Sequence, residues 1–331
     1  MNKELIDKFS RVHTNLRISI TDQCNFRCVY CMPEDMTFVE DKELMTFDEI
    51  IHLVRIFVNL GISKIRVTGG EPLVRREVPE LIKRLYQIEG LSDISLTTNG
   101  IGLINQAKAL YDAGLRRINV SLDTLNATKF EQMTRRKVLA KVLDGLEEAQ
   151  NCGFNPIKIN AVPIRGLTEN ELIDLAEFAR RHSYQLRFIE FMPLDADDIW
   201  GKDMFIPGEE IISKINAIYP LAPIQNVGSR KHDTAKRYRF IDGTGEIGII
   251  ASVSDPFCNQ CNRVRLTADG KFRTCLFSLT ETDLLMHLRA GAPDGVIADL
   301  IVESVRNKDA GHKINTSDFV KPERNMSKIG G

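Results

Sequence analysis

Six short apolar runs alternate with amphipathic helical segments over about the first 190 residues, and this alternation restricts the possible folds more than any other feature. Ile, Val, Leu or Phe recurs at about every second position of each run, and we expect strands covered on both faces. The runs lie at 15–20, 64–68, 93–97, 117–122, 157–162 and 185–191. The pattern predicts right-handed βαβ units and a parallel sheet. Six units are two fewer than a closed barrel needs, so we expect an α/β fold with an open, partial (β/α)6 TIM-like barrel. A doubly wound open sheet is the alternative on pattern alone.

Two of the intervening helices begin with recognisable N-terminal capping motifs. Thr46-Phe47-Asp48-Glu49 has the form of a capping box, and the helix that it opens should stop before Gly61. Thr168-Glu169-Asn170-Glu171 has the same form and predicts a second helix that runs to about His182.

Polar and glycine-rich residues follow five of the six predicted strands. The first strand is followed by a cysteine-rich loop, and the second by Thr68-Gly69-Gly70-Glu71-Pro72. The others are followed by Thr97-Thr98-Asn99-Gly100, Ser121-Leu122-Asp123 and Glu190-Phe191-Met192-Pro193. The carboxyl ends of parallel strands meet at one rim, where active sites of such barrels lie. We therefore expect a site at this rim.

The loop after the first strand holds Cys24, Cys28 and Cys31, three thiols within eight residues. Structural zinc needs four ligands, and the nearest histidines, His13 and His52, lie outside the loop. An iron–sulfur cube normally takes four cysteines, and a cube held by three keeps one iron open for a ligand. The spacing therefore favours an iron–sulfur centre over zinc.

Beyond about residue 195 the strand–helix alternation stops, and a different organisation is expected. A helix near 207–218 precedes two hairpins, which turn at Asp242-Gly243-Thr244-Gly245 and at Asp269-Gly270. A second thiol set accompanies the hairpins and consists of Cys258, Cys261 and Cys275. Spacing alone leaves zinc and iron–sulfur equally open here, because His287 or His232 could complete a zinc site. We expect two domains, 1–194 and an α+β extension at 195–331.

Composition excludes several other classes. The formal net charge of −1 gives no reason to expect a nucleic-acid coat or an anionic membrane surface as partner. No apolar run approaches the length of a membrane span, and the N-terminus lacks the apolar core of a signal peptide, so we expect a cytoplasmic protein. Six of the seven cysteines lie in the two tight sets, which fits metal ligation in a reducing compartment better than disulfides. Cys152 is interpreted as structural.

The C-x-x-x-C-x-x-C spacing, with the aromatic Tyr30 before its last cysteine, resembles the signature of the radical S-adenosylmethionine (SAM) superfamily. The second thiol set, together with Arg263-Val264-Arg265 and the final Gly330-Gly331, narrows the resemblance to the GTP 3′,8-cyclase family of molybdenum cofactor synthesis. The likeness runs from about Asn15 to the last residue. It implies a lyase that converts GTP into (8S)-3′,8-cyclo-7,8-dihydroguanosine 5′-triphosphate. In that chemistry, reductive cleavage of SAM gives a 5′-deoxyadenosyl radical that removes the 3′ hydrogen of GTP.

The resemblance also implies roles for individual residues. Cys24, Cys28 and Cys31 would hold the 4Fe-4S cluster that binds SAM, and Cys258, Cys261 and Cys275 a second 4Fe-4S cluster. The SAM pocket would be lined by Tyr30, Gly70, Ser121 and Met192, with Glu71 near the SAM ammonium. GTP would be held by Arg17, Arg66, Thr97, Lys158, Arg263, Val264 and Arg265. Catalytic roles are implied for Arg17, Gly330 and Gly331, with the last two threaded into the barrel.

The implied partners are GTP and an electron donor of the reduced flavodoxin or ferredoxin type, with no nucleic acid and no membrane. The chain is expected to be a monomer or a homodimer. Two other functions compete with this interpretation. One is a radical SAM enzyme that modifies peptides, although such domains usually carry more than three additional cysteines and have no reason to end in Gly-Gly. The other is a non-catalytic metal-binding scaffold.

Overall fold

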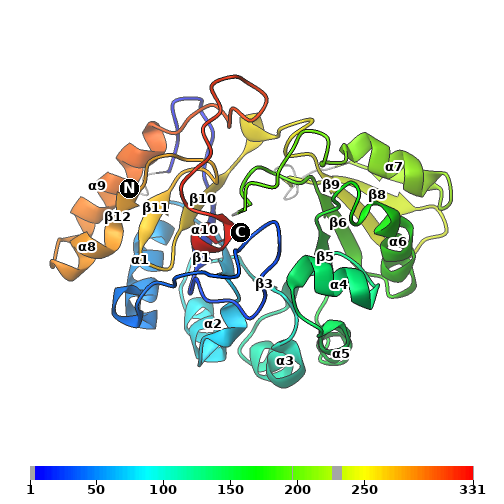
Figure 1. Ribbon diagram of the computed structural model, residues 1–331. Helices are drawn as coiled ribbons and strands as arrows, with labels where there is room; N and C mark the ends of the chain where they lie inside the picture. The colour runs from blue at the N-terminus through cyan, green and yellow to red at the C-terminus, as the bar shows by residue number, and fades with distance from the viewer. Residues whose placement is uncertain (1–3, 196, 226–232, 331) are drawn as a thin grey trace.

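The computed structural model describes residues 4–195, 197–225 and 233–330 (Figure 1). All of its named strands belong to one twelve-stranded sheet with the order β12-β11-β10-β1-β2-β3-β4-β5-β6-β9-β8-β7. Helices cover the outer face of the curved sheet (Figure 1). Across these described ranges, no helix combines the length and apolar character needed to cross a bilayer.

The six predicted strands form the centre of this sheet and pair in parallel in chain order, which confirms the partial barrel. The observed ends lie within two residues of the predicted ones. The strands are β1 (Asn15–Ser19), β2 (Lys64–Thr68), β3 (Asp93–Thr98), β4 (Arg117–Ser121), β5 (Ile157–Ala161) and β6 (Gln185–Ile189).

The last third of the chain adds strands to both edges of this arc. On one edge β10 (Arg263–Leu266) pairs in parallel with β1, and on the other β9 (Glu246–Ile250) pairs in parallel with β6. The sheet then continues in antiparallel fashion through β11 (Lys271–Arg273) and β12 (Thr282–Asp283), and through β8 (Lys236–Phe240) and β7 (Leu221–Ile224). The parallel arc is therefore two strands longer than the six predicted. The predicted hairpins are both present. The predicted domain boundary near residue 194 falls between β6 and α7, and the strands before and after it belong to the same sheet.

The helices that follow the central strands form a layer outside the arc. They are α1 (Phe47–Asn59), α2 (Val78–Tyr86), α3 (Leu103–Asp112), α4 (Ala127–Thr134), α5 (Leu139–Asn151) and α6 (Leu172–Arg181). The C-terminal part contributes α7 (Gly208–Asn216), α8 (Leu284–Arg289), α9 (Asp294–Arg306) and the single-turn α10 (Met326–Ile329). The main apolar core lies between the sheet and these helices.

Of the two predicted capping boxes, only the first forms. At the start of α1, the Glu49 backbone N–H donates to Thr46 Oγ1 (3.2 Å), and the Thr46 N–H donates to the Glu49 carboxylate (2.7 Å). The box predicted at Thr168 is wrong. Thr168 accepts instead from the N–H of Ile164, and Glu171 turns to Thr124 and Lys129, so a short 3-10 turn precedes α6.

Candidate active site

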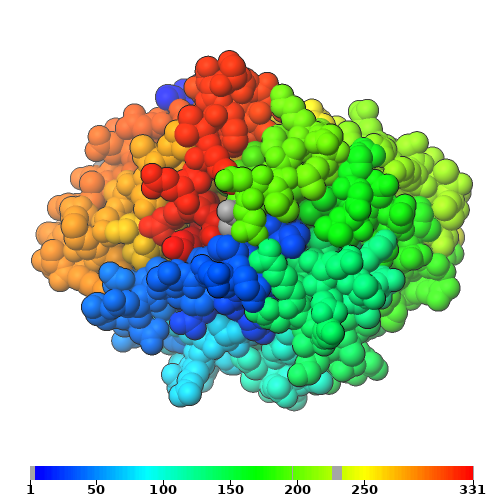
Figure 2. Space-filling model, in the orientation of Figure 1, coloured from blue at the N-terminus to red at the C-terminus, as the bar shows by residue number. Residues whose placement is uncertain are grey.

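A cavity of about 670 Å³ opens at the carboxyl ends of the central strands, and both cysteine sets line it. Figure 2 shows the C-terminal segment, in red, packed beside the N-terminal part of the chain, in blue, over this mouth. All six cysteines have free thiols. The predicted rim site and the two predicted metal sites are therefore one space.

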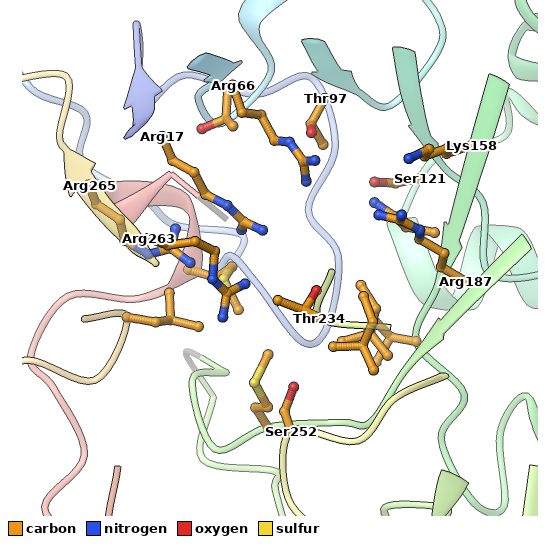
Figure 3. Close-up of a pocket in the computed structure, with 18 of the residues that line it drawn as sticks. Arg17, Arg66, Thr97, Ser121, Lys158, Arg187, Thr234, Ser252, Arg263 and Arg265 are labelled. Carbon is orange, nitrogen blue, oxygen red and sulfur yellow. The ribbon is translucent and has the colours of Figure 1, made fainter. Parts of the chain in front are cut away.

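Strand register explains why the cavity is basic. In β1, β2 and β10 the arginines alternate with apolar residues, and Arg17 lies in register with both Arg66 and Arg265. Because successive side chains of a strand point to opposite faces, the apolar residues reach the core and the arginines reach the lumen. Figure 3 shows Arg17, Arg66 and Arg263 directed into one space. Val264 is the exception among the predicted GTP residues, since its side chain is fully buried in the core and does not line the cavity.

Three of the lumenal arginines have no carboxylate partner among the residues that the structure describes. Among the described residues, no ion pair is made by Arg17, Arg66 or Arg263; Arg66 only donates to Ser95 Oγ at 3.4 Å, and Arg263 stacks over the Phe257 ring. Burial and the neighbouring cations lower the pKa of Arg66 to about 9. Positive charge that is buried without carboxylates is costly, so the cavity is prepared for a polyanion.

Lys158 and Arg187 extend this charge to the far wall, on β5 and β6. Burial, followed by the proximity of Arg187, lowers the pKa of Lys158 to about 6. Arg187 was missed from the sequence. It lies 3.4 Å from the Asp233 carboxylate and shares the lumen with Lys158 (Figure 3). The sequence pattern that could have identified Arg187 is the one seen at Arg66, a cation between apolar residues of a strand.

Three further predicted residues line the same cavity. Thr97 lies at the end of β3, and its Oγ1 is buried without a hydrogen-bond partner in the described part of the chain. Ser121 ends β4, and Met192 follows β6. A buried hydroxyl without a partner is uncommon, so Thr97 is available to a bound ligand.

The first cysteine loop is held by the Gly-Gly-Glu-Pro turn. The N–H groups of Gly70 and Glu71 donate to the carbonyls of Thr21 and Gln23, both at 2.7 Å. A Cβ on Gly70 would lie only 2.4 Å from the Gln23 oxygen. The close approach that requires glycine here is thus to the loop backbone. The Glu71 carboxylate accepts from the N–H groups of Leu73 and Asn99 and from the Thr98 hydroxyl, and burial raises its pKa to about 7.

Tyr30, between the last two cysteines of the loop, is fixed by a carboxylate beyond β4. Its hydroxyl donates to Asp123 Oδ2 at 2.8 Å, while Asp123 Oδ1 accepts from the Val162 N–H at 2.8 Å. Burial raises the pKa of Asp123 to about 6. This pair ties the loop to the opposite part of the rim.

Buried charged residues from both ends of the chain contact the second cysteine set. Arg11 donates to the Cys258 carbonyl at 2.6 Å and pairs with Asp7 at 2.6 Å. Lys308 Nζ lies 4.0 Å from the Cys261 sulfur. Although burial alone would raise it, the pKa of Cys261 falls to about 6 because Arg263 and Lys308 favour the thiolate.

The donor sets fit clusters better than single ions. Of the two histidines considered for zinc, His287 lies on α8 outside the cavity lining, and His232 lies outside the described residues. Where the chain is described, no three His, Cys, Asp or Glu side chains could hold a metal ion together. In a 4Fe-4S cube each thiolate binds a different iron, so the thiols need only face a common space, as both sets do.

The C-terminal tail lies at this cavity, which Met326 and Ser327 help to line. Gly330 has φ 80°, and a Cβ there would lie 2.8 Å from Thr68 Oγ1 and 2.9 Å from Ser19 Cβ, at the ends of β2 and β1. Its carbonyl accepts from Arg265 Nη1 at 2.5 Å. Arg265 therefore meets the tail, while Gly331 lies outside the described residues.

Comparison with known proteins first gives the class of protein. Residues 18–179 match the radical SAM superfamily, and residues 184–314 match the Molybdenum Cofactor Synthesis C family. Two solved structures share the fold. One is Streptococcus suis SuiB bound to precursor peptide SuiA (TM-score 0.62, 13% identity, 91% of this chain and 69% of that one). The other is anSMEcpe with bound AdoMet (TM-score 0.61, 15% identity, 91% and 82%). The barrel with its cysteine loop is that of a radical SAM enzyme.

Curated relatives narrow the class to one family. A GTP 3′,8-cyclase from Rhodopirellula baltica is 46% identical, with 99% of this chain and 92% of the relative covered. Those of Streptomyces coelicolor and Thermodesulfovibrio yellowstonii are 45% and 43% identical, with 99% and 98% of this chain and 96% and 99% of the relatives covered. This chain belongs to the GTP 3′,8-cyclase family.

Proposed function

We propose that this chain converts GTP into (8S)-3′,8-cyclo-7,8-dihydroguanosine 5′-triphosphate, the first step of molybdenum cofactor synthesis. The observation that carries the proposal is that two cysteine sets face one cavity with Arg17, Arg66 and Arg263, which make no ion pair among the described residues. A scaffold that only stored metal would have no use for buried arginines without carboxylates. A substrate with a triphosphate requires them.

The cysteines are assigned to two 4Fe-4S clusters, with SAM as the second cofactor. Cys24, Cys28 and Cys31 would hold the cluster that binds SAM, and Cys258, Cys261 and Cys275 the other. When bound and reduced, the first cluster supplies the electron that cleaves SAM into methionine and a carbon radical able to remove a hydrogen atom. The protein's part is to place one C–H bond of GTP in front of that radical and to keep water away.

The lumenal cations perform this placement. Arg17 and Arg66, together with Lys158 and Arg187 across the cavity, surround the space that a triphosphate would fill. Arginine offers paired donors to phosphate oxygens, and lysine offers a point charge. Arg263 lies beside the second cysteine set and would hold the guanine end, while Thr97 offers its unpartnered hydroxyl.

The SAM residues are supported by position. Tyr30 and Gly70 belong to the first loop and to the turn that holds it, and Ser121 and Met192 line the adjacent rim. The electron donor of flavodoxin or ferredoxin type, the monomeric or dimeric state, the cytoplasmic location and the division at residue 194 stay predictions.

The test compares two arginine variants of the reconstituted protein. Arg66→Ala removes a lumenal cation that has no ion-pair partner among the described residues. Arg84→Ala removes a half-exposed cation on α2 that pairs with Asp48 outside the cavity. We expect Arg66→Ala to keep its iron content but to lose at least tenfold in GTP affinity and in cyclised product, while Arg84→Ala behaves like wild type.

Anaerobic incubation with SAM, reductant and GTP, followed by assay of 5′-deoxyadenosine and of nucleotide products, gives the readout. If wild-type protein cleaves SAM but leaves GTP unchanged, the proposed substrate is wrong. If Arg66→Ala binds and converts GTP normally, the lumenal role of the arginines is wrong.

A further inference from the structure

The C-terminal segment that crosses the cavity mouth is anchored by Lys321, which pairs with Asp195 and Asp198, and more firmly by Arg324. Its guanidinium faces two carboxylates at once. Nη1 and Nη2 lie 3.1 and 2.8 Å from the two oxygens of Asp269, and Nη2 and Nε lie 2.8 and 3.2 Å from Oε1 of Glu281. Asp269 is in the β10–β11 turn, and Glu281 directly precedes β12.

Both carboxylates are themselves held in place. Asp269 accepts from the Thr267 hydroxyl at 2.6 Å, and Glu281 accepts from Arg273 Nη1 at 2.8 Å. The side chains of Arg324, Asp269 and Glu281 are only 19%, 17% and 27% exposed. An isolated surface ion pair contributes little. A bidentate arginine between two braced and largely buried carboxylates is a different case, because its geometry is already set.

Directly after Arg324, the chain makes contacts with both halves of the active site. Asn325 caps α10, and its Nδ2 lies 3.6 Å from Met36 Sδ, beyond the first cysteine loop. Ser327 lines the same cavity as Cys31. Three residues further on, the Gly330 carbonyl meets Arg265. One short segment therefore lines the cavity together with the first cysteine set and also contacts the lumenal Arg265.

This segment cannot hold its own shape. Helix α10 has four residues, and a helix of one turn is not stable by itself in water. Its position must come from contacts with the rest of the chain. Ile329 is buried in the core, and the Gly330 carbonyl meets Arg265 at the far end. At the near end, the fixed point is the Arg324 site.

We propose that Arg324 is a positioning residue: with Asp269 and Glu281 it forms a latch that holds residues 325–330 against Cys31 and Arg265. The proposal rests on the proposed function, because it assumes that the tail serves cyclisation. It predicts that releasing the latch frees the tail and impairs cyclisation while both clusters stay in place.

The test uses the reconstituted full chain and three variants. Arg324→Ala removes the latch. Arg324→Lys keeps the charge but cannot bridge both carboxylates in bidentate fashion. Arg289→Ala is the matched control, because Arg289 also pairs with one carboxylate, Glu49, at 2.7 and 3.1 Å and donates to two backbone carbonyls, but it lies outside the cavity lining.

Hydrogen exchange at residues 325–329 is the first readout, and it does not depend on activity. We expect exchange there to rise at least tenfold in Arg324→Ala, less in Arg324→Lys and not at all in Arg289→Ala, with iron content unchanged in all three. The second readout is kcat for cyclised product, which should fall at least tenfold in Arg324→Ala, with partial recovery in Arg324→Lys.

Unchanged exchange in Arg324→Ala overturns the latch, and so does increased exchange with normal cyclisation. If wild type gives no cyclised nucleotide, the proposed function fails, and the exchange comparison still decides whether Arg324 orders the tail. The two failures are therefore distinguishable.

Discussion

Replacing Gly70 by alanine should dislodge the first cysteine loop. The added Cβ would lie 2.4 Å from the Gln23 oxygen and 2.5 Å from the Asp22 oxygen. Carbon and oxygen atoms in ordinary contact are roughly 1 Å further apart, so the loop backbone must move by about that distance. Forced packing of this kind costs about 1–3 kcal/mol. Weakening the two hydrogen bonds from Gly70 and Glu71 adds about 0.5–1.5 kcal/mol each.

Gly295 provides a matched control with the opposite sign. It lies in the first turn of α9, has ordinary helical backbone, and no heavy atom lies within 4 Å of its added Cβ. Gly295→Ala should therefore stabilise the protein by about 0.5–1 kcal/mol. Urea unfolding measures both changes.

Iron and acid-labile sulfide provide the functional side of this prediction. Two 4Fe-4S cubes correspond to about eight iron per chain, and we expect Gly70→Ala to retain about half and to lose SAM cleavage. The second cluster should stay. A Gly70→Ala protein with full iron content and wild-type stability would refute the conclusion that the close approach of the cysteine-loop backbone requires glycine at this position.

Three further predictions concern separate parts of the chain. Thr46→Ala removes the hydroxyl that accepts from Glu49 and should lower the free energy of unfolding by about 1 kcal/mol; an unchanged urea midpoint would contradict it. Lys158, with its pKa lowered to about 6, is mostly neutral in the free protein at pH 8, and a triphosphate favours its charged form. GTP binding should therefore take up a proton, and affinity should fall as pH rises from 6 to 8; calorimetry in buffers of different ionisation enthalpy should show uptake in wild type and none in Lys158→Met. Cys275→Ala should keep the first cluster and SAM binding but lose GTP turnover. Normal GTP turnover in this variant would show that the second cysteine set is not part of the active site.

The central strands could be predicted closely because apolar residues recur at about every second position of each run and reach the core. The cysteine sets and the rim were predictable for a similar reason, since parallel strands bring their carboxyl ends together. Arg66 was expected to hold GTP, and it does line the cavity, because a cation between apolar residues of a strand needs a polar environment. Arg187 had the same pattern and could have been found by applying that argument to β6.

Other features depended on contacts between distant parts of the chain. Thr168 and Glu171 match the capping-box motif in sequence, but the Glu171 carboxylate accepts hydrogen bonds from Thr124 and Lys129 on a neighbouring segment instead. The strands β9 and β10 are predictable as members of hairpins, yet nothing local indicates that each also pairs in parallel with an edge of the arc. Arg265 is another such case, since its partner is the carbonyl of Gly330.

The order in which the strands are synthesised differs from the order in which they pair. β1 is made early, but its outer neighbour β10 is made late, and the hydrogen bond from Asn262 to Thr14 beside this pairing joins residues 248 positions apart. Until then, the edges of β1 and β6 present unpaired backbone groups, which are prone to wrong association. Contacts between such distant residues also form slowly. Because β10 starts two residues after Cys261, the cavity that both cysteine sets line is complete only when most of the chain has been synthesised.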